Sequence, residues 1–409
     1  MSRTRNYVWA LAVITFMAFW SSARGAVLSE QAAKQPTGTD LAFSIFQTKC
    51  TGCHGNPSVP RAPSPAAIRA MTPERIYLAL TTGVMKVQGT SLSDADKKRL
   101  AHFMTGRPVG STEEADAKQM PNHCPSNPPL SNTSNSAHWN GWGVDETNSR
   151  FQPEKEAGIT AADVPKLRLK WAFAFPAGVS SFAQPTVVSG RVFIGSDIGY
   201  VYSLDAKTGC VYWSYRTKSS VRTAMNIGAG GSATKYAVYF GDKAGNIYAV
   251  DAQSGKELWA KKVDDHFTAQ ITAAPTLYAG RLYVPVSSFE EIAADSPNYP
   301  CCTFRGSVVA LDARTGRMLW KTYVMPPAKP TKKNAQGVQL YGPAGASVWN
   351  SPTIDVQRHA VYFGTGNAQT CPAASTSDAV MALSMATGKV RWSYQELAGD
   401  CPGEGRMRT

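Results

Sequence analysis

The run Cys50-Thr51-Gly52-Cys53-His54 places two thiols about one helical turn apart and an imidazole directly after the second thiol. Thiols at this spacing can add to the vinyl groups of a haem, and the adjacent histidine then becomes an axial ligand of the iron. We therefore predict a covalently attached haem c, held through Cys50 and Cys53, with His54 bound to the iron. A zinc site or a redox-active cysteine pair is the alternative, although no second C-x-x-C motif or paired histidine cluster completes a zinc site.

Helical patterns surround this run. One covers Leu41–Phe46, a second covers Thr72–Leu80, and a third covers Ser93–Phe103. The second opens with a threonine cap, a proline at the first helical position and a glutamate in the first turn. We predict a small all-α domain over residues 38–108, which resembles a monohaem cytochrome c domain.

The resemblance places the sixth iron ligand in the loop before the last helix. Met85 lies in Thr82-Gly83-Val84-Met85-Lys86, and Leu92-Ser93-Asp94 follows at the distance that such domains show after their axial methionine. Met71 and Met104 fall in helical patterns, where a buried structural methionine is expected. A thioether ligand raises the haem potential, which suits an electron acceptor.

The N-terminus has the layout of a secretory signal peptide. Arg3 and Arg5 precede an apolar run from Tyr7 to Trp20, and small residues follow up to Gly25. We predict a signal peptide over residues 1–25, a periplasmic protein, and no stable membrane span after processing. An uncleaved anchor is the alternative, although the apolar run is shorter than the roughly 20 residues that a spanning helix needs. An oxidising compartment favours disulfides among the cysteines outside the haem motif, whose connectivity the sequence leaves open. These are Cys124, Cys210, Cys301, Cys302, Cys371 and Cys401.

The charge and length limit the kinds of partner. A chain of 409 residues with 43% hydrophobic residues can form more than one folded unit. The formal net charge of +13 is spread along the chain instead of forming a basic arm, so we expect an acidic redox partner or an anionic surface, and no nucleic acid. The segment 109–135 is polar and rich in serine, asparagine and proline, which predicts a linker.

A repeat fills the chain after this linker. Apolar alternation enters a turn of the type D-A-x-[ST]-G, and a tryptophan follows four residues after the glycine, as expected for a β-hairpin. The tryptophans of successive copies lie 42 to 72 residues apart, a period typical of β-propeller blades with insertions. They are Trp171, Trp213, Trp259, Trp320 and Trp392. We expect Trp213, Trp259, Trp320 and Trp392 to pack between blades.

This repeat is similar to that of the pyrroloquinoline quinone dehydrogenases, whose eight-bladed propellers hold the quinone and a calcium ion on the central axis. The stretch Gly364-Thr365-Gly366-Asn367 resembles the family's calcium-ligand loop, and Trp349 falls where the family places the indole floor under the quinone. The resemblance implies Glu290 and Asn367 as calcium ligands. It also implies quinone contacts from Arg222, Thr272 and Ser287, in addition to Trp349.

The chemistry of the implied ligands is consistent with these roles. Calcium prefers hard oxygen donors such as a carboxylate and an amide oxygen, and a bound calcium ion would polarise a quinone carbonyl. Arg222 would stabilise the oxygen as it gains negative charge.

Two features depart from the family pattern. The family's vicinal disulfide lies before the arginine, whereas Cys301 and Cys302 follow Glu290. Two pairings are compatible with the sequence: a disulfide between these neighbours at the pocket mouth, or two separate long-range disulfides. Near the C-terminus Asp400 matches an acidic residue of the family, but Gly403 stands where the family has its general base. Asp400 is the remaining candidate for that base. Only about half of an eight-bladed propeller, over residues 136–409, is expected, and we predict a C-terminally truncated chain.

The order of the two parts indicates one branch of the quinohaemoprotein alcohol dehydrogenases. A cytochrome domain followed by the propeller, with Cys301-Cys302-Thr303-Phe304-Arg305-Gly306 inside the third repeat, is most similar to the cytochrome-type polyvinyl alcohol dehydrogenases. This resemblance implies oxidation of secondary alcohols, free or polymeric, with electrons passing to haem c and on to a soluble acceptor such as a cytochrome c. The alternative is a truncated, catalytically inactive propeller with an electron-transfer cytochrome c domain. A scaffold propeller without quinone is a third possibility.

Overall fold

The computed structural model describes residues 38–401 except 57–58, 60–61, 70, 111–116, 118–119, 131–137, 177–180 and 295–298. The predicted signal peptide and Gly403 lie outside the described residues. Within the described part, no helix combines the length and the hydropathy needed to cross a membrane.

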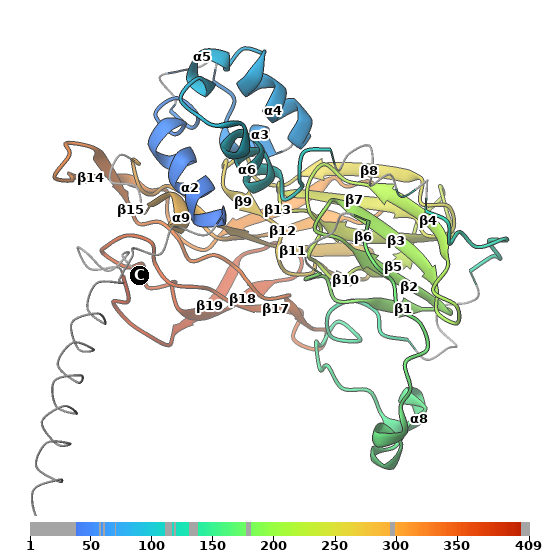
Figure 1. Cartoon of the computed structure of the whole chain (residues 1–409). Helices are drawn as coiled ribbons and strands as arrows, with labels where there is room; N and C mark the ends of the chain where they lie inside the picture. The colour runs from blue at the N-terminus through green and yellow to red at the C-terminus, as the bar shows by residue number, and fades with distance from the viewer. Residues whose placement is uncertain are drawn as a thin grey trace, which may run out of the picture. The chain divides into compact units, whose positions relative to one another are not determined.

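Short helices make up the described N-terminal part (Figure 1). They are α2 (Gly38–Lys49), α3 (Pro65–Arg69), α4 (Pro73–Thr81), α5 (Lys86–Gly89) and α6 (Asp94–Thr105). Helix α4 begins after Thr72, whose hydroxyl accepts a hydrogen bond from the backbone N–H of Arg75, and α6 begins after Ser93 with the equivalent bond from Asp96. Both caps confirm helix starts that were predicted from the sequence. Helix α4 packs against α6, with Ile76, Leu80 and Leu100 buried.

Antiparallel four-stranded sheets follow, each built from strands that are consecutive in the chain. The first contains β1 (Thr186–Val188), β2 (Arg191–Gly195), β3 (Tyr200–Asp205) and β4 (Val211–Arg216); the second contains β5 (Asn226–Ala229), β6 (Tyr236–Gly241), β7 (Asn246–Asp251) and β8 (Glu257–Lys262). The third contains β10 (Thr276–Tyr278), β11 (Arg281–Ser288), β12 (Ser307–Asp312) and β13 (Met318–Tyr323), and β9 (Ala269–Gln270) also pairs with β11. The fourth contains β16 (Thr353–Asp355), β17 (Ala360–Gly364), β18 (Ala379–Ser384) and β19 (Val390–Gln395).

The remaining elements are short. Strands β14 (Lys329–Lys333) and β15 (Gln339–Gly342) form a hairpin, and the other helices are α8 (Glu154–Ala157), η2 (Ala161–Lys166) and α9 (Glu290–Ala294).

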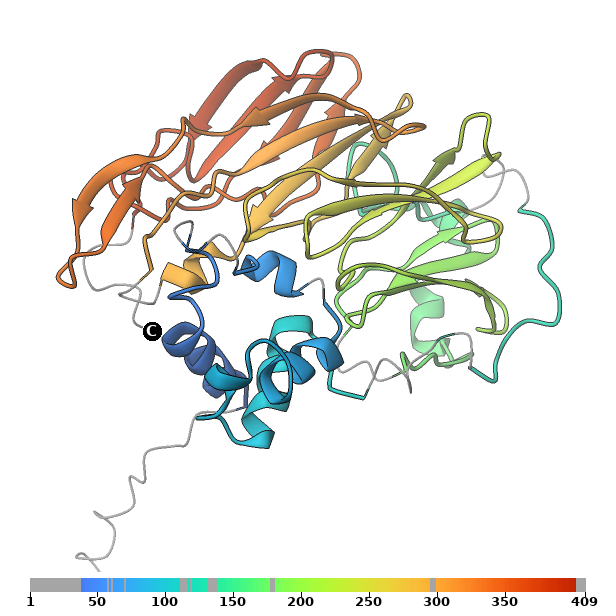
Figure 2. The ribbon, with the colours of Figure 1, turned by 90° about the horizontal axis from the view of Figure 1, so that it is seen from above.

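Each sheet packs its face against the next sheet in chain order (Figure 2). Val201 and Phe193 of the first sheet share a core with Val238 of the second. Further cores join the second sheet to the third and the third to the fourth. This arrangement of four-stranded antiparallel sheets is the blade packing of a β-propeller, as predicted.

The repeated tryptophan of one unit contacts the repeated glycine of the next. A Cβ placed on Gly255 would lie 2.7 Å from the ring of Trp213, and the Trp213 Nε1–H donates to the carbonyl of Ala252 at 3.1 Å. Gly255 has φ +73°, a conformation that favours glycine. Equivalent contacts join Trp171 to Gly209, Trp259 to Gly316 and Trp320 to Gly388. Trp213, Trp259 and Trp320 therefore pack between blades, as expected. The expectation is wrong for Trp392, which lies on the last described sheet, is 46% exposed and contacts no described glycine in this way.

The predicted linker over residues 109–135 is attached to the first two sheets where it is described. Cys124 forms a disulfide with Cys210 at the start of β4. The Arg191 guanidinium donates to Asn127 Oδ1 at 2.6 Å and to the carbonyl of Pro128 at 2.7 Å. Residues from Ala42 onward belong to one compact unit. The polar sequence of the linker thus reflects hydrogen bonding to the sheets as well as solvent.

Candidate functional site

A cavity of about 360 Å³ lies among the helices of the N-terminal part. Cys50, Cys53, His54 and Met85 all line it, and the rest of its wall is mostly apolar. Cys50 and Cys53 are free thiols. The structure therefore brings together all the residues predicted to hold haem c, in the apolar surroundings that a porphyrin needs, and the residues present fit that group.

The contacts of His54 leave the correct nitrogen available for iron. His54 is 8% exposed, and its Nδ1 lies 2.9 Å from the carbonyl oxygen of Pro63. Because a carbonyl can only accept, Nδ1 carries the proton and Nε2 keeps its lone pair. A backbone carbonyl that orients the imidazole in this way is the usual partner of a metal-binding histidine.

The zinc alternative receives no support from the same residues. Burial, with a smaller effect of Cys53, raises the pKa of the Cys50 thiol to about 11. In the part of the chain that the structure describes, no group of three or more histidine, cysteine or acidic side chains is placed to hold a metal ion.

Three methionines line the haem cavity. Met71 and Met104, which were expected to be structural, line it together with Met85. Met104 is buried, whereas Met85 precedes α5 in the loop that was predicted to supply the ligand. Met85 stays the predicted sixth ligand.

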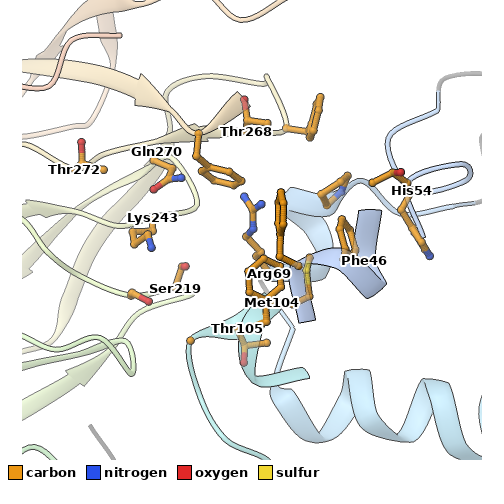
Figure 3. Close-up of a pocket in the computed structure, with 18 of the residues that line it drawn as sticks. Phe46, His54, Arg69, Met104, Thr105, Ser219, Lys243, Thr268, Gln270 and Thr272 are labelled. Carbon is orange, nitrogen blue, oxygen red and sulfur yellow. The ribbon is translucent and has the colours of Figure 1, made fainter. Parts of the chain in front are cut away.

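A second cavity, of about 340 Å³, lies between the helices and the sheets (Figure 3). Phe43, Phe103 and Arg69 line it from the helices, and Arg222 and Thr272 line it from loops of the sheets. Trp349 also contributes to this wall. Phe46, His54 and Met104 line both cavities, so the haem cavity and the second cavity share a wall.

The second cavity is strongly cationic. Arg69, Arg222 and Lys243 line it, and its described lining contains no aspartate or glutamate. The Arg69 guanidinium lies 3.4 Å from the centre of the Phe289 ring, and burial lowers its pKa to about 9, which still leaves it charged at neutral pH. Burial, followed by the charges of Arg69 and Arg222, lowers the pKa of Lys243. Such a cavity fits a flat ligand with several carboxylates, which is the chemistry of pyrroloquinoline quinone.

The loop Gly364–Asn367 supports the indole of Trp349. A Cβ on Gly366 would lie 3.1 Å from Trp349 Nε1, so the loop backbone packs closely against the indole. Trp349 remains 45% exposed, which leaves part of the indole open to a ligand in the cavity. The structure thus brings Trp349 and the predicted loop together, as the resemblance implied.

Thr272 and Ser287 are also brought together. Their hydroxyl oxygens lie 2.7 Å apart, and the fully buried Ser287 also donates to the carbonyl of Gln270 at 3.3 Å. Thr272 lines the second cavity, whereas Ser287 lies behind it and orients the Thr272 hydroxyl.

The residues predicted for calcium do not fit that ion as they are folded. Glu290 is fully buried and accepts hydrogen bonds from the Tyr299 hydroxyl at 2.8 Å and from the backbone N–H groups of Thr303 and Phe304 at 2.7–3.1 Å. Both carboxylate oxygens are therefore occupied by protein donors. The Asn367 amide donates to the carbonyl of Ala368 at 3.2 Å, and neither Glu290 nor Asn367 lines the second cavity.

Cys301 and Cys302 form a vicinal disulfide, which is one of the two pairings that the sequence allowed. Both are buried in a cluster with Tyr299 and Phe267, two residues that line the second cavity. The disulfide therefore lies behind the cavity wall instead of at its mouth.

Asp400 lies away from the second cavity. It is exposed and lies near the Cys371–Cys401 disulfide. The pKa of Asp378 is raised mainly by the burial of Asp378 and further by the charge of Asp400. The structure does not bring Asp400 to Arg222, Thr272 and Trp349, so its placement gives no support to a role as general base.

Sequence reasoning missed several polar residues of the cavity. Arg69 ends the short helix α3, Lys243 lies in the turn between β6 and β7, and Thr268 precedes β9. None belongs to a motif or a repeated spacing. Only packing places them around one cavity.

Comparison with known proteins gives a family match for the helical part and another for the sheets. The family described as glucose/ethanol/alcohol dehydrogenase, beta-propeller domain (PQQ) matches residues 139–401, and the family described as cytochrome C oxidase, cbb3-type, subunit III matches residues 39–104.

Two relatives are named polyvinylalcohol dehydrogenase. The one from Pseudomonas sp is 40% identical over 97% of this chain and 62% of its own length, and the one from Sphingopyxis sp. (strain 113P3) is 36% identical over 87% of this chain and 56% of its own length. The chain thus spans about three fifths of the length of these relatives.

The quinohemoprotein alcohol dehydrogenase from Comamonas testosteroni has a similar fold, with a TM-score of 0.52 and 24% identity over 66% of this chain and 42% of that one. Together with the sequence matches, this fold confirms the resemblance predicted above. The chain belongs to the PQQ family of glucose/ethanol/alcohol dehydrogenase β-propellers and carries a cytochrome domain at the N-terminal side of the propeller.

Proposed function

We propose that this chain binds haem c and pyrroloquinoline quinone and takes part in the oxidation of secondary alcohols of the polyvinyl alcohol type. The haem domain extends over residues 38–108 and the propeller part begins at residue 136. The observation that carries the proposal is the wall that the two cavities share, formed by Phe46, His54 and Met104. A haem ligand in the wall of the quinone cavity allows electrons to pass over a short distance.

The cations and the indole of the second cavity have separate roles in binding. Arg69, Arg222 and Lys243 attract and orient the carboxylates of the quinone. The exposed part of Trp349 packs against its flat ring system. Because Ser287 donates to the carbonyl of Gln270, the Thr272 hydroxyl donates to Ser287 and can accept a hydrogen bond from a ligand in the cavity.

The helical domain closes the cavity on one side. Phe43, Phe46 and Phe103 form an apolar wall there, which excludes water from the reacting groups. When bound, the quinone supplies the two-electron oxidant for the alcohol and haem c supplies a one-electron carrier.

The remaining assignments rest on the sequence and on the relatives. Two relatives named polyvinylalcohol dehydrogenase support a polymeric or small secondary alcohol as the substrate. The net charge of +13 suits an acidic, soluble electron acceptor such as a cytochrome c. The predicted signal peptide supports a periplasmic location.

Haem reduction tests the proposal directly. The purified haem-loaded chain is mixed with pyrroloquinoline quinone and pentane-2,4-diol, a small analogue of the polymer, and the haem spectrum is followed. We expect reduction only when quinone and alcohol are both present, and slower reduction in Trp349→Ala. Quinone binding is measured separately by calorimetry. Bound quinone with no alcohol-dependent reduction would contradict the proposal.

One observation favours a second candidate. No carboxylate is among the described lining of the second cavity, and Asp400 lies outside it, so a general base for the alcohol is missing from this wall. A haem domain that carries electrons beside a non-catalytic propeller would show haem reduction by an external donor such as ascorbate and none by alcohol.

A further inference from the structure

A third cavity, of about 420 Å³, is lined by residues of the second and third sheets. Its wall is formed by the end of β8, the loop over residues 263–266, the segment before β12, and strand β13. Strands β8 and β13 are edge strands of their sheets. None of its described lining residues lines the haem cavity or the second cavity. The third cavity is therefore a separate feature of the propeller part.

Positive side chains outnumber acidic side chains in the wall of the third cavity. The cations are Lys261, Lys262, Arg305 and Lys321, and the acids are Asp264 and Asp265. Asp264 is buried and forms a salt bridge with Lys321 at 2.6 Å. Among the described residues, no acidic side chain forms an ion pair with Lys261, Lys262 or Arg305. The wall therefore carries positive charge that the protein itself leaves uncompensated.

Lys321 departs from the pattern of the repeat. It directly follows Trp320, whereas the other copies have a small residue after their tryptophan: Ser214, Ala260 and Ser393. The Lys321 ammonium group donates to the carbonyl of Val263 at 3.0 Å and to the carboxylate of Asp264 at 2.6 Å, and so connects the third sheet to the loop after the second. Because a small residue is sufficient at this position in the other blades, the lysine is a local feature of the third cavity.

Arg305 is held in place while most of its donors remain available. Its guanidinium carbon lies 3.7 Å from the centre of the Tyr323 ring, and Nη1 donates to the carbonyl of Met325 at 3.4 Å. This is the one hydrogen bond that its side chain makes within the described part of the chain, although a guanidinium has five N–H groups. The Lys321 ammonium group lies 4.6 Å from the centre of the same ring. Two cations that share one ring repel each other, and a bound anion relieves this repulsion.

The cations face the third cavity from two sides. Lys261 and Lys262 are exposed at the end of β8, and Arg305 and Lys321 lie on the side of the third sheet. Tyr323 is 39% exposed, so this wall is open to solvent. A carboxylate can accept two parallel hydrogen bonds from a guanidinium. A ligand with one carboxylate can contact one side, whereas a ligand with several carboxylates can contact both.

We propose that the third cavity binds an organic anion with two or three carboxylates. Arg305 and Lys321 hold it on one side and Lys262 holds it on the other, so that the ligand joins the second sheet to the third. Asp265 lies in the same wall and opposes binding. The inference involves neither the haem nor the quinone, and it goes beyond the proposed function.

Calorimetry tests the proposal on the purified, haem-loaded chain at low salt, with no quinone or alcohol present. The probe is propane-1,2,3-tricarboxylate, and we expect butyrate, a monocarboxylate of similar length, to bind about tenfold more weakly or less. Arg305→Gln should weaken tricarboxylate binding by about tenfold or more. Lys262→Gln, at an exposed position, should weaken it by about two- to fivefold. Lys235→Gln is the matched control, since it removes an exposed cation that lies over the ring of Tyr236, outside the third cavity.

Asp265→Asn gives a result that misfolding cannot produce. Removal of this negative charge should tighten tricarboxylate binding by about two- to fivefold. Unchanged or weaker binding in Asp265→Asn would contradict the proposed position of the ligand.

The second cavity is also cationic, so Arg222→Gln serves to locate the ligand. We expect tricarboxylate binding to be unchanged in this variant. Full binding in Arg305→Gln with a loss in Arg222→Gln would place the ligand in the second cavity and overturn the proposal. Absence of binding, or equal affinity for butyrate or inorganic phosphate, would overturn it as well. Because no step needs turnover, a failure of alcohol-dependent haem reduction would refute the proposed function and leave this result unaffected.

Discussion

Replacing Gly255 with alanine tests whether the repeated contact between tryptophan and glycine stabilises the packing of neighbouring sheets. Gly255 has φ +73°, and a Cβ there would lie 2.7 Å from the Trp213 ring. Trp213 is 6% exposed and donates to the carbonyl of Ala252 at 3.1 Å, so it has little room to move. The substitution therefore strains the backbone and also displaces a buried indole.

The size of each effect follows from the geometry. Placing alanine in a left-handed conformation costs about 1–2 kcal/mol. Overpacking against a buried ring costs a further ~1–3 kcal/mol, so the free energy of unfolding should fall by about 2–5 kcal/mol in total. Gly280 provides the matched control because it has φ +74° and a Cβ there would have no other atom within 4 Å. Gly280→Ala should lose only the backbone contribution, about 1–2 kcal/mol.

Urea denaturation followed by circular dichroism measures both variants against the wild type. The difference between Gly255→Ala and Gly280→Ala isolates the contact with Trp213 and is expected to be ~1–3 kcal/mol. Equal losses in the two variants would refute the reasoning, since they would show that the indole moves aside without cost.

Three further predictions concern the haem domain and the second cavity. Met85→Leu should remove the near-infrared charge-transfer band of a methionine-ligated ferric haem and lower its potential, measured by absorption and redox titration; an unchanged band would assign the ligand to another residue. Arg69→Gln should weaken quinone binding by about 10- to 100-fold in calorimetry, because one charge-assisted hydrogen bond is worth about 1.5–3 kcal/mol, whereas Lys207→Gln, at an exposed turn, should leave it unchanged. The hydrogen bond from Tyr77, followed by that from Lys98, lowers the pKa of Asp94, so its stabilising effect is present above the unfolded value of about 3.9 and is lost as the pH falls below it. Asp94→Asn should flatten that part of the thermal-midpoint profile, most clearly at low salt, and an identical acid dependence in both proteins would contradict the assignment.

The haem motif and the blades were predictable because they depend on neighbouring residues. Cys50, Cys53 and His54 fall on one short segment, and helix caps such as Thr72 and Ser93 act within one turn. The hairpins likewise depend on a local alternation of apolar residues and on a glycine turn. Hydrogen bonding and side-chain periodicity over a few residues were sufficient for these features.

The composition of the second cavity depended on packing over long distances. Arg69, Lys243 and Trp349 come from three separate parts of the chain, and no spacing in the sequence relates them. The sequence could identify Glu290 as an acidic residue, but only the fold shows that Tyr299, Thr303 and Phe304 occupy its oxygens.

Sequence alone therefore determined which groups can carry the chemistry of the haem, together with the repeating architecture behind it. Tertiary structure alone decided which side chains face one another: it placed Asp400 outside the second cavity and brought the Thr272 hydroxyl to Ser287. The physical reason is that local conformation follows from short-range sterics and hydrogen bonds. The direction in which a distant side chain points is set by how whole sheets and helices pack.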